Sequence, residues 1–480
     1  MKRPLTPACF TLVSVLGLGV SVIAQSTAAQ SAVQSRAAQS GASQSGSAQA
    51  LVITNARILD GTGRAIERGS VVVRDGRIVS VSAGGAGRVP GARVIDAQGR
   101  TVMPGFIDAH RHIIRGDAAQ WLTGEAPARM QEFLDAGFMT VVSAGDATEQ
   151  ILELRRRSSA GTINAPRIFA AGRVQLARAA APAAPAVGGG AVPDAGRGAR
   201  TAVGAAAGRG AGGRGDPARF DVSRPPLRPT QAAGAIPVED TVKAVEAVAK
   251  AGFDYIKTAI TATPGGPEIA TLRLVVSEGR KHNIPTITHA VSVIDTLAAV
   301  DAGPAVLVHT PHIGRLEEEL AAVEKIAKAG IPMTSTLAVF TPHFDDQNTP
   351  LFRDAQPFPW NTIASAGQGP VNARLLWEAG LSLGYGTDTS WHPRESLADE
   401  LRALQVTFSP RDIVKMLGPG AAASALKSRE LGTLEPGKLA DIVILNGDLL
   451  VSVTNLLDVA VTIKGGEVVV DRRARGRARR

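Results

Sequence analysis

The sequence predicts an α/β fold: a (β/α)8 barrel of the TIM type, joined to a small β-sandwich domain that is built from both chain ends. Three observations support this prediction. Eight strand-like apolar runs lie between residues 101 and 388, and amphipathic helical segments separate several of them. Shorter strand patterns with tight-turn residues flank this region on both sides. The chain has 480 residues and is 44% hydrophobic, enough for one large core or two ordinary ones.

Residues 1–24 have the features of a secretory signal peptide. Two basic residues precede an apolar run, and small residues at 22 and 24 fit a cleavage site after Ala24. The run is short for a membrane span, which needs ~20 residues, so we expect no stable membrane insertion. Cys9 is the single cysteine and would be removed with the signal, which excludes disulfides and cysteine nucleophiles from the mature protein. We therefore expect an exported protein, periplasmic or secreted.

A linker and a set of short strands follow the signal. Residues 25–50 are mostly Gln, Ser, Ala and Gly, the composition of a disordered, flexible linker. Short strand patterns occupy residues 51–100, with an Asp-Gly hairpin turn, and recur over residues 429–470, with a Gly-Gly turn. Because a long α/β region separates the two sets, we predict one composite β-sandwich domain made from both.

Residues 101–428 form the expected barrel. Strand-like runs such as "FDYIKTAI" and "IPTITHA" alternate with helical segments such as "EDTVKAVEAVAKAG" and "RLEEELAAVEKIAKAG". In these helices apolar residues recur every three or four positions and a glycine follows the end. Repeated βα units imply parallel strands, and eight such units imply a closed barrel.

The barrel region is longer than the roughly 250 residues that are typical of this fold. The excess is one low-complexity insertion at about residues 174–235, which has too few large apolar residues to form a core. Since it follows the third strand, it lies on the face where loops build the active site. It can be a mobile lid or a tolerated spacer, and we favour the spacer.

The formal net charge of +9 does not indicate a nucleic-acid partner. The signal contributes +2, the insertion +5 and the basic tail at 471–480 another +5, which leaves −3 for the expected folded part. Only 4% of the residues are aromatic, so no stacking platform for bases is indicated. We expect a small-molecule partner instead. The tail could attach to anionic surfaces, and homo-oligomer formation stays open.

The first barrel strand ends in a His-x-His pair. Side chains alternate along a strand, so His110 and His112 face one side together with Asp108, while Arg111 faces the other. Two imidazoles so placed can bind one cation. An isolated His-x-His is more often a pair of polar residues that happen to end a strand, so the other strands decide the interpretation.

Other expected strands end in residues of the same kind. The carboxyl ends of all the barrel strands meet on one face, so their last residues come together there. Imidazole nitrogens and a carboxylate oxygen are ligands that suit zinc or a similar divalent ion. The predicted metal ligands are His110, His112, Lys257, His289, His309 and Asp388.

Lys257 is the unusual member of this set. An ammonium group would be repelled by metal cations, but burial and neighbouring positive charge favour the neutral amine. A neutral amine can add carbon dioxide to give a carbamate, an anion that is able to bridge two metals. The alternative interpretation of Lys257 is an ion pair across the barrel.

Several motifs together resemble the amidohydrolase superfamily. They are "MPGFIDAHRH", the lysine of "FDYIKTAI", the histidines of "ITHA" and "LVHTPH", the "GTDTS" stretch and "LGTLEPGKLADIVILNGD". The likeness is to the binuclear branch related to imidazolonepropionase and the prolidase-like carboxypeptidases, and it covers residues 51–470 except the insertion. One departure is "VHT" around the fourth histidine, where the family more often has Glu-His-Gly.

The resemblance implies a binuclear centre with two divalent metal ions, and zinc is the expected metal. It places His110, His112 and Asp388 on one metal and His289 and His309 on the other. Carboxylated Lys257 is the implied bridging ligand between them.

Such a centre predicts a hydrolase acting on carbon-nitrogen bonds. Two metals can share a water, lower its pKa and polarise a carbonyl, so we expect a metal-bridging hydroxide to attack an amide carbon. Asp388 is the expected catalytic residue, which takes the proton from that water and passes it to the leaving nitrogen. The resemblance favours dipeptides, N-acyl amino acids or similar carboxylate-bearing, including aromatic, amides. The alternatives are a hydrolase of cyclic amides, imides or lactones, and a non-catalytic exported protein that binds a metal or another ligand.

Six further residues near expected strand ends are candidates to hold a substrate carboxylate or the oxyanion. The two arginines, Arg115 and Arg394, could equally be solvated loop residues, and Tyr255 could pack inside the barrel. The candidates are Arg115, Tyr255, His312, His343, His392 and Arg394.

Overall fold

The computed structural model describes residues 50–179, 234, 236–340, 343–344, 350–351 and 363–473. The expected signal peptide, almost all of the linker, most of the insertion and most of the basic tail lie outside the described residues. All the described residues belong to one compact unit, which spans Gln49–Arg480. Within them, every helix is too short or too polar to cross a membrane.

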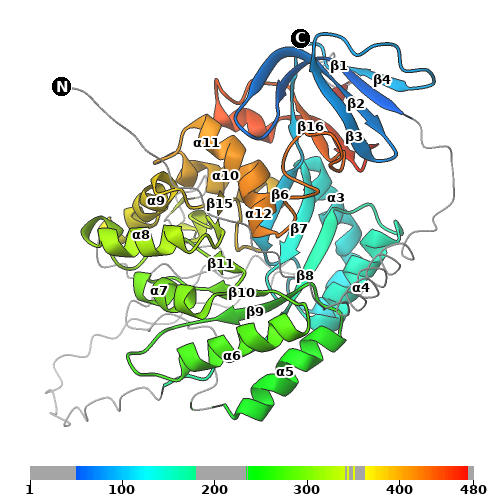
Figure 1. Ribbon diagram of the computed structural model, residues 1–480. Coiled ribbons are helices and arrows are strands. Elements are labelled where there is room, and N and C mark those ends of the chain that lie inside the picture. Colours follow the sequence, from blue (N-terminus) through cyan, green and yellow to red (C-terminus); the bar gives the residue numbers. More distant parts are fainter. Residues whose placement is uncertain are drawn as a thin grey trace, which may run out of the picture. The chain divides into compact units, whose positions relative to one another are not determined.

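Eight parallel strands form the barrel at the centre of Figure 1. Their order is β15-β12-β11-β10-β9-β8-β7-β6. Backbone hydrogen bonds close the ring, because the Ala109 amide donates to the Tyr385 carbonyl at 3.1 Å and the Asp388 amide to the His110 carbonyl at 2.8 Å. The predicted (β/α)8 barrel is therefore confirmed. Its strands are β6 (Phe106–Arg111), β7 (Phe138–Ser143), β8 (Arg167–Arg173), β9 (Tyr255–Ala259), β10 (Thr286–His289), β11 (Val306–Val308), β12 (Met333–Thr334) and β15 (Leu383–Gly384).

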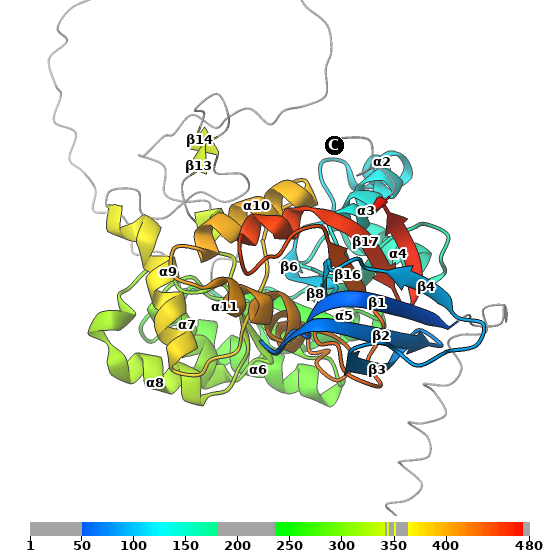
Figure 2. The same cartoon turned by 90° about the horizontal axis from the view of Figure 1, so that it is seen from above.

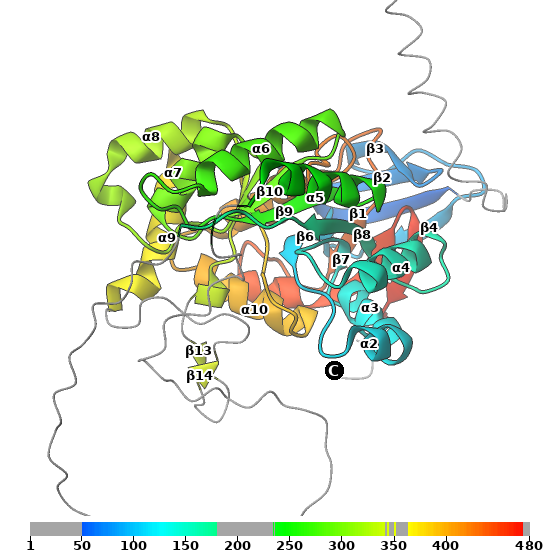
Figure 3. The ribbon, with the colours of Figure 1, turned by 90° about the horizontal axis from the view of Figure 1, so that it is seen from below.

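Helices cover the outside of the barrel, and Figure 3 shows α5, α6 and α7 along β8, β9 and β10. The predicted helix over residues 239–252 is α5, which buries Thr241, Val245 and Val248 at helical spacing. The one expected over 315–330 is divided into η1 and α8 by Glu319, whose φ of −129° and ψ of 59° are not helical. The helices are α2 (Ala118–Gly124), α3 (Ala126–Asp135), α4 (Thr148–Ser159), α5 (Val238–Lys250), α6 (Glu268–Lys281), α7 (Val293–Ala302), η1 (Leu316–Glu318), α8 (Leu320–Lys328), η2 (Ala338–Phe340), α9 (Ile363–Glu378), α10 (Pro393–Leu404), α11 (Pro410–Lys415), η3 (Met416–Gly420), α12 (Ala421–Ser424) and η4 (Val453–Leu457).

Strands from both chain ends form a second sheet, which confirms the composite origin that the sequence predicts; the described strands form one eight-stranded sheet where a sandwich of two sheets was expected. Its order is β18-β17-β16-β5-β1-β2-β3, with β4 paired to β1. Figure 2 shows the blue strand β1 in the same sheet as β16 and β17 from the other end of the chain, and β5 pairs with both β1 and β16. Ile53, Ile95 and Ile442 are among the fully buried residues of its own apolar core. The strands are β1 (Leu51–Leu59), β2 (Ala65–Arg74), β3 (Arg77–Ala83), β4 (Arg93–Asp96), β5 (Thr101–Pro104), β16 (Ile442–Leu445), β17 (Val459–Lys464) and β18 (Glu467–Asp471); a separate pair is β13 (His343–Phe344) with β14 (Pro350–Leu351).

The single barrel strand expected over residues 101–110 is two strands in the structure. β5 pairs with β1 and β16 in the second sheet, and β6 pairs with β7 in the barrel. The break falls at Pro104, which has no amide hydrogen to continue a ladder, and at Gly105. A side chain at Gly105 would place its Cβ 2.5 Å from the Met139 sulfur, so a larger residue at the crossing from one sheet to the other would have to displace the buried Met139 side chain.

The insertion leaves and re-enters the barrel at one point. The Arg178 amide donates to the Gly234 carbonyl at 3.1 Å, and the Gly234 amide donates to the Arg178 carbonyl at 3.0 Å. Residues 174–179, which the sequence assigns to the insertion, continue from β8, and Val174, Leu176 and Ala177 are buried. The segment between the two described ends is therefore closed at its base by a pair of backbone hydrogen bonds.

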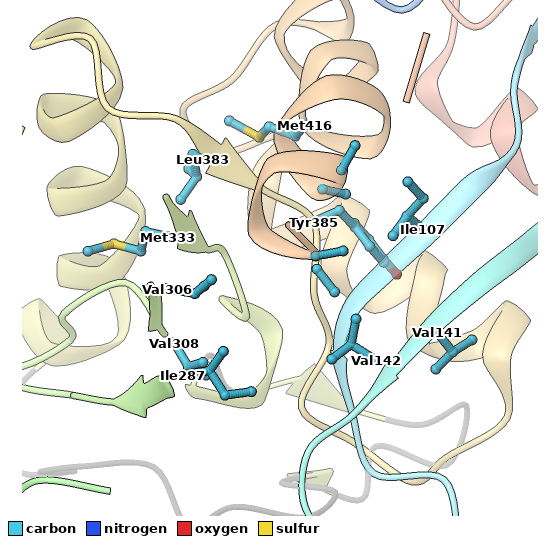
Figure 4. Packing of buried hydrophobic residues seen from close by; sticks show 14 of the residues in the cluster. Ile107, Val141, Val142, Ile287, Val306, Val308, Met333, Leu383, Tyr385 and Met416 are labelled. Carbon is cyan, nitrogen blue, oxygen red and sulfur yellow. The ribbon is translucent and has the colours of Figure 1, made fainter. Parts of the chain in front are cut away.

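Buried apolar side chains fill the barrel and fix the backbone at its rim. Figure 4 shows Tyr385 reaching from beyond β15 toward Ile107 on β6 and Val142 on β7. Ile287 and Val306, from β10 and β11, are 2% and 1% exposed. Because interiors of this density resist movement, side chains at the carboxyl ends of the strands start from fixed backbone positions.

Candidate metal centre

The structure brings the six predicted metal ligands together at the carboxyl rim of the barrel. They come from five strands or from the segments that follow these strands: Lys257 lies in the middle of β9, and Asp388 lies four residues after the end of β15. Asp388 lies at the centre of the group. Its Oδ1 is 3.1 Å from His110 Nε2 and 3.3 Å from His112 Nε2, while its Oδ2 is 3.6 Å from His309 Nε2. The two carboxylate oxygens therefore face different histidines.

The remaining two ligands contact these histidines directly. Lys257 Nζ lies 3.2 Å from His110 Nε2, and His289 Nδ1 lies 2.6 Å from His309 Nε2. Ligand atoms of His110, His309 and Asp388 all lie within 4.8 Å of one another, an arrangement that could hold a metal ion.

A hydrogen bond selects the tautomer of His309. The Thr336 hydroxyl donates to the Ser335 carbonyl at 2.8 Å, so at 2.7 Å from His309 Nδ1 it acts as the acceptor. The proton of the neutral ring is then on Nδ1, and the lone pair is on Nε2, which points at Asp388 and His289. Metal-binding histidines are commonly oriented in this way by a partner on their second nitrogen.

The protonation states of the cluster also suit a metal. Burial, followed by the charge of Lys257, lowers the pKa of His110 to about 4 and that of His289 to about 3. Burial lowers the pKa of Lys257 to about 7. Burial alone would raise the pKa of Asp388, but nearby His110 and His309 hold it well below its usual value. Neutral imidazoles, a carboxylate and a partly neutral amine make a donor set that fits divalent ions.

Three residues of the rim have left-handed backbone conformations. The φ angles are 76° at His309, 46° at Thr336 and 50° at Asp388. Non-glycine residues pay about 1–3 kcal/mol each for sparsely populated conformations of this kind, which persist only where the surroundings enforce them. At Asp388 the enforcement includes the bond from its own amide to the His110 carbonyl. Such strain commonly gathers at functional sites.

A buried network holds the loop that carries Asp388. Asp108 accepts hydrogen bonds from the hydroxyl and the amide of Thr387, at 2.7 and 3.2 Å. Arg111 donates to the Thr387 hydroxyl at 3.0 Å and to the Trp391 carbonyl. The register of β6 shifts between Asp108 and Arg111, which lets both side chains reach Thr387 although strict alternation would separate them.

Glu400 on α10 supports the loop after β12 and was not predicted. It accepts from the Ser335 hydroxyl at 2.6 Å, the Leu337 amide at 2.9 Å and the Ala338 amide at 2.8 Å. The residue is fully buried, and burial raises the pKa of its carboxyl to about 7. These three bonds flank Thr336, so Glu400 fixes the backbone that presents the hydroxyl to His309.

Two of the predicted substrate contacts are buried. The centre of the His312 ring lies 4.1 Å from that of the Phe340 ring, which is 5.4 Å from that of the His309 ring. Among the residues that the structure describes, neither nitrogen of His312 has a hydrogen-bond partner. The Tyr255 hydroxyl donates to the Ala425 carbonyl at 2.6 Å inside the barrel. The structure therefore commits Tyr255 to the core, in line with the alternative interpretation of this residue.

The other four candidates are spread more widely. Arg115 lines a cavity beside His112, together with Arg173, which the sequence argument missed although it ends the third barrel strand. His392 and Arg394 begin α10; His392 Nδ1 lies 2.9 Å from a Glu132 oxygen on α3, and Arg394 donates to the Leu457 carbonyl at 3.3 Å. His343 belongs to β13, and its side chain lies outside the described part of the chain.

The structure is thus an eight-stranded parallel barrel. Its carboxyl rim carries four histidines, a lysine and an aspartate, which place the protein in the class of barrel proteins with a candidate metal centre. The model of the amidohydrolase family matches residues 101–469, and the chain belongs to this family. The family consists of hydrolases that act on carbon-nitrogen bonds.

Relatives of known activity match over short stretches. An N-acyl-D-aspartate deacylase from Alcaligenes xylosoxydans xylosoxydans is 44% identical over 61 residues, 13% of this chain and 12% of that protein. An imidazolonepropionase from Shouchella clausii is 24% identical over 212 residues, 42% of this chain and 41% of that protein. The chain thus spans less than half the length of these curated relatives.

Solved structures match over most of the chain. A Xaa-Pro dipeptidase with bound methionine has a TM-score of 0.64 and 20% sequence identity, over 88% of this chain and 99% of that one. At this level of identity the likeness shows the fold.

Proposed function

We propose that the protein is a metal-dependent amide hydrolase that acts on small amides carrying a carboxylate, such as dipeptides or N-acyl amino acids. The observation that supports this most directly is the convergence of six side chains, Asp388 and five possible nitrogen donors, with successive contacts of 2.6 to 3.6 Å. Membership of the amidohydrolase family supports the reaction class. The names of two similar proteins, an N-acyl-D-aspartate deacylase and a Xaa-Pro dipeptidase, support the substrate class.

The residues that would hold two divalent metal ions, with zinc as the expected metal, are His110, His112, His289, His309 and Asp388, with carboxylated Lys257 between the ions. When bound, such ions lower the pKa of a water and polarise a substrate carbonyl. The burial of Lys257 favours the neutral amine that addition of carbon dioxide requires.

Asp388 is the residue that we propose for proton transfer. Its pKa is held low by the neighbouring histidines, so it is ionised and able to accept the proton of the attacking water. It then passes this proton to the leaving nitrogen, so that the amine departs neutral. The buried bonds of Asp108 and Arg111 to Thr387 keep the carboxylate in position for both transfers.

The similarity to an imidazolonepropionase favours a second candidate, a hydrolase of cyclic amides, imides or lactones on the same residues. Comparing linear N-acyl amino acids with cyclic imides and lactones separates the two.

The first test is the metal content of the mature protein, measured by elemental mass spectrometry after purification without chelators. We expect about two ions per chain, and hydrolysis of linear carboxylate-bearing amides by the loaded protein. About one ion per chain would argue against a lysine bridge. A loaded protein that cleaves neither a broad amide panel nor the cyclic compounds would overturn the proposal and favour a binding role.

A further inference from the structure

A cavity of about 390 Å³ opens at the rim of the barrel next to the candidate metal centre. This volume lies within the ~300–1,000 Å³ range of small-molecule sites. His112 lines the cavity, and its Nε2 lies 3.3 Å from Asp388 Oδ1, so the cavity borders the candidate centre. Other lining residues are Arg115, Asp146, Arg173 and Ser390.

Among the described lining residues Asp146 is the single carboxylate, and its oxygens are hydrogen-bonded within the protein. Asp146 is 4% exposed, and both its oxygens accept hydrogen bonds. The donors are the Ile113 amide at 3.0 Å, the Ile114 amide at 3.3 Å and the Ser143 hydroxyl at 2.8 Å. These bonds fix the chain just after His112 and compensate the negative charge, so Asp146 does not make the cavity a cation site.

The positive charges of the two arginines in the lining are not compensated by such contacts. Within the described residues, neither Arg115 nor Arg173 forms an ion pair with a carboxylate. The Arg115 guanidinium lies over the Trp391 ring, 4.7 Å from its centre, and this contact restrains the side chain in the cavity lining. Arg173 Nε donates to the Gly145 carbonyl at 2.6 Å, which fixes the direction of the guanidinium.

Arg173 is also placed beside the centre by strand pairing. It is the last residue of β8, and its Cα partner in β9 is Lys257, one of the six predicted ligands. A guanidinium group presents its donors in a planar fork that matches a carboxylate, and such charge-assisted bonds are among the stronger ones in proteins. Two uncompensated guanidinium groups in a cavity next to a hydrolytic centre favour an anionic ligand there.

We propose that this cavity is the carboxylate subsite of the enzyme, in which Arg173 and Arg115 bind the substrate carboxylate on the His112 side of the centre. The inference rests on the proposed function and adds an orientation to it. An N-acyl amino acid fits this arrangement, because only one carbon separates its carboxylate from the scissile amide. Arg173 and Arg115 then determine specificity for anionic over neutral amides.

The test compares matched substrates and matched variants. Each N-acetyl amino acid that the protein cleaves is paired with the neutral amide in which hydrogen replaces the carboxylate, for example N-acetylphenylalanine with N-acetylphenethylamine. The variants are Arg173→Met and Arg115→Met. The control is Arg156→Met, which removes the same charge from an arginine that is 66% exposed and paired with Glu153 on α4.

The quantity that decides is the ratio of kcat/KM for the carboxylate form to that for the neutral form. We expect Arg173→Met to lower this ratio about ten- to hundredfold, which corresponds to the loss of charged hydrogen bonds. The expected direction is the same for Arg115→Met, and the control is expected to keep the wild-type ratio. A wild-type protein without preference for the carboxylate, or an Arg173→Met variant with an unchanged ratio, would overturn the subsite and leave amide hydrolysis standing.

Failure of the proposed function is recognised separately. If the metal-loaded protein cleaves no amide, calorimetric binding of N-acetylphenylalanine still tests the cavity. Binding that is lost in Arg173→Met and retained in Arg156→Met supports an anion subsite, and binding that is equal in the two variants overturns it. Thermal unfolding of each variant shows whether the substitution has changed the fold instead.

Discussion

The bond between Thr336 and His309 gives the sharpest prediction about the metal centre. Replacing Thr336 by Val keeps the size and the branched Cβ of a residue with a φ of 46°, but it removes the hydroxyl. His309 is fully buried, so its Nδ1–H has no water to replace the lost acceptor. An unpaired buried donor of this kind costs about 1–3 kcal/mol.

The cost of Thr336→Val is expected to appear mainly in metal affinity. Without the hydroxyl, His309 can move its proton to Nε2, and binding a metal then requires the ring to return to the unpaired tautomer. A difference of about 1–3 kcal/mol corresponds to an increase of about 5- to 150-fold in the dissociation constant for the metal. Partners of metal-binding histidines commonly have effects of about 10- to 100-fold when they are removed.

The assay is competition for zinc against a chelator of known affinity, with thermal unfolding of the metal-free protein alongside. Thr336→Ser is the control, because it keeps the hydroxyl and should bind zinc nearly as the wild type does. Zinc affinity in Thr336→Val equal to that of the wild type would refute the reasoning, and so would a Ser variant as weak as the Val variant.

Four further predictions address other residues. Asp388→Asn should retain most of the metal and lose about 10²–10⁴-fold in kcat, the usual range for a proton-transfer residue; a variant with full activity would contradict the assignment. Burial raises the pKa of Glu400 from 4.5 to about 7, so its stabilising contribution is complete below pH 4.5 and lost as pH rises toward 7. Denaturation at several pH values should show that the difference in unfolding free energy between Glu400→Gln and the wild type changes across this window by about 3 kcal/mol at most. A difference that stays constant with pH would contradict this. Tyr255→Phe should lower stability by about 1 kcal/mol through loss of the bond to Ala425, with kcat/KM unchanged; a lower kcat/KM would restore Tyr255 as a substrate contact. Export with cleavage after Ala24 predicts a mature N-terminus at Gln25, which N-terminal sequencing of the exported protein checks.

The grouping of the six candidate ligands at the barrel rim could be predicted from the sequence because a simple rule relates position in the chain to position in the fold. In a parallel barrel the carboxyl ends of all strands meet on one face, so a residue that ends a strand is near the end of every other strand. The same rule applies to Arg173, which ends the third strand. It was missed because the low-complexity segment follows it directly. Thr336 was missed for another reason, since a hydroxyl is not a typical zinc ligand and its role is to orient one.

Other features depended on information that sequence patterns do not contain. Glu400 reaches Ser335 across 65 positions of the chain, and only the packing of α10 brings them together. A strand pattern over residues 101–110 does not show that its two halves belong to different sheets. Proximity to a strand end also did not reveal the direction of the side chain, so Tyr255 and Arg115 were ranked alike, although one faces the core and the other a cavity.

The paired backbone hydrogen bonds between Arg178 and Gly234 have a consequence for how this chain can change in evolution. Where the two ends of a loop are held together, lengthening the loop costs little, about 0.6 kcal/mol for each doubling. Sequence can then be gained or lost between these residues while the barrel keeps its strands, its register and its rim of ligands. Because this point follows β8, it lies on the same face as the candidate metal centre and only a few residues beyond Arg173. The fold thus has a place where new segments can be added beside the candidate metal centre while the barrel that positions its residues stays the same.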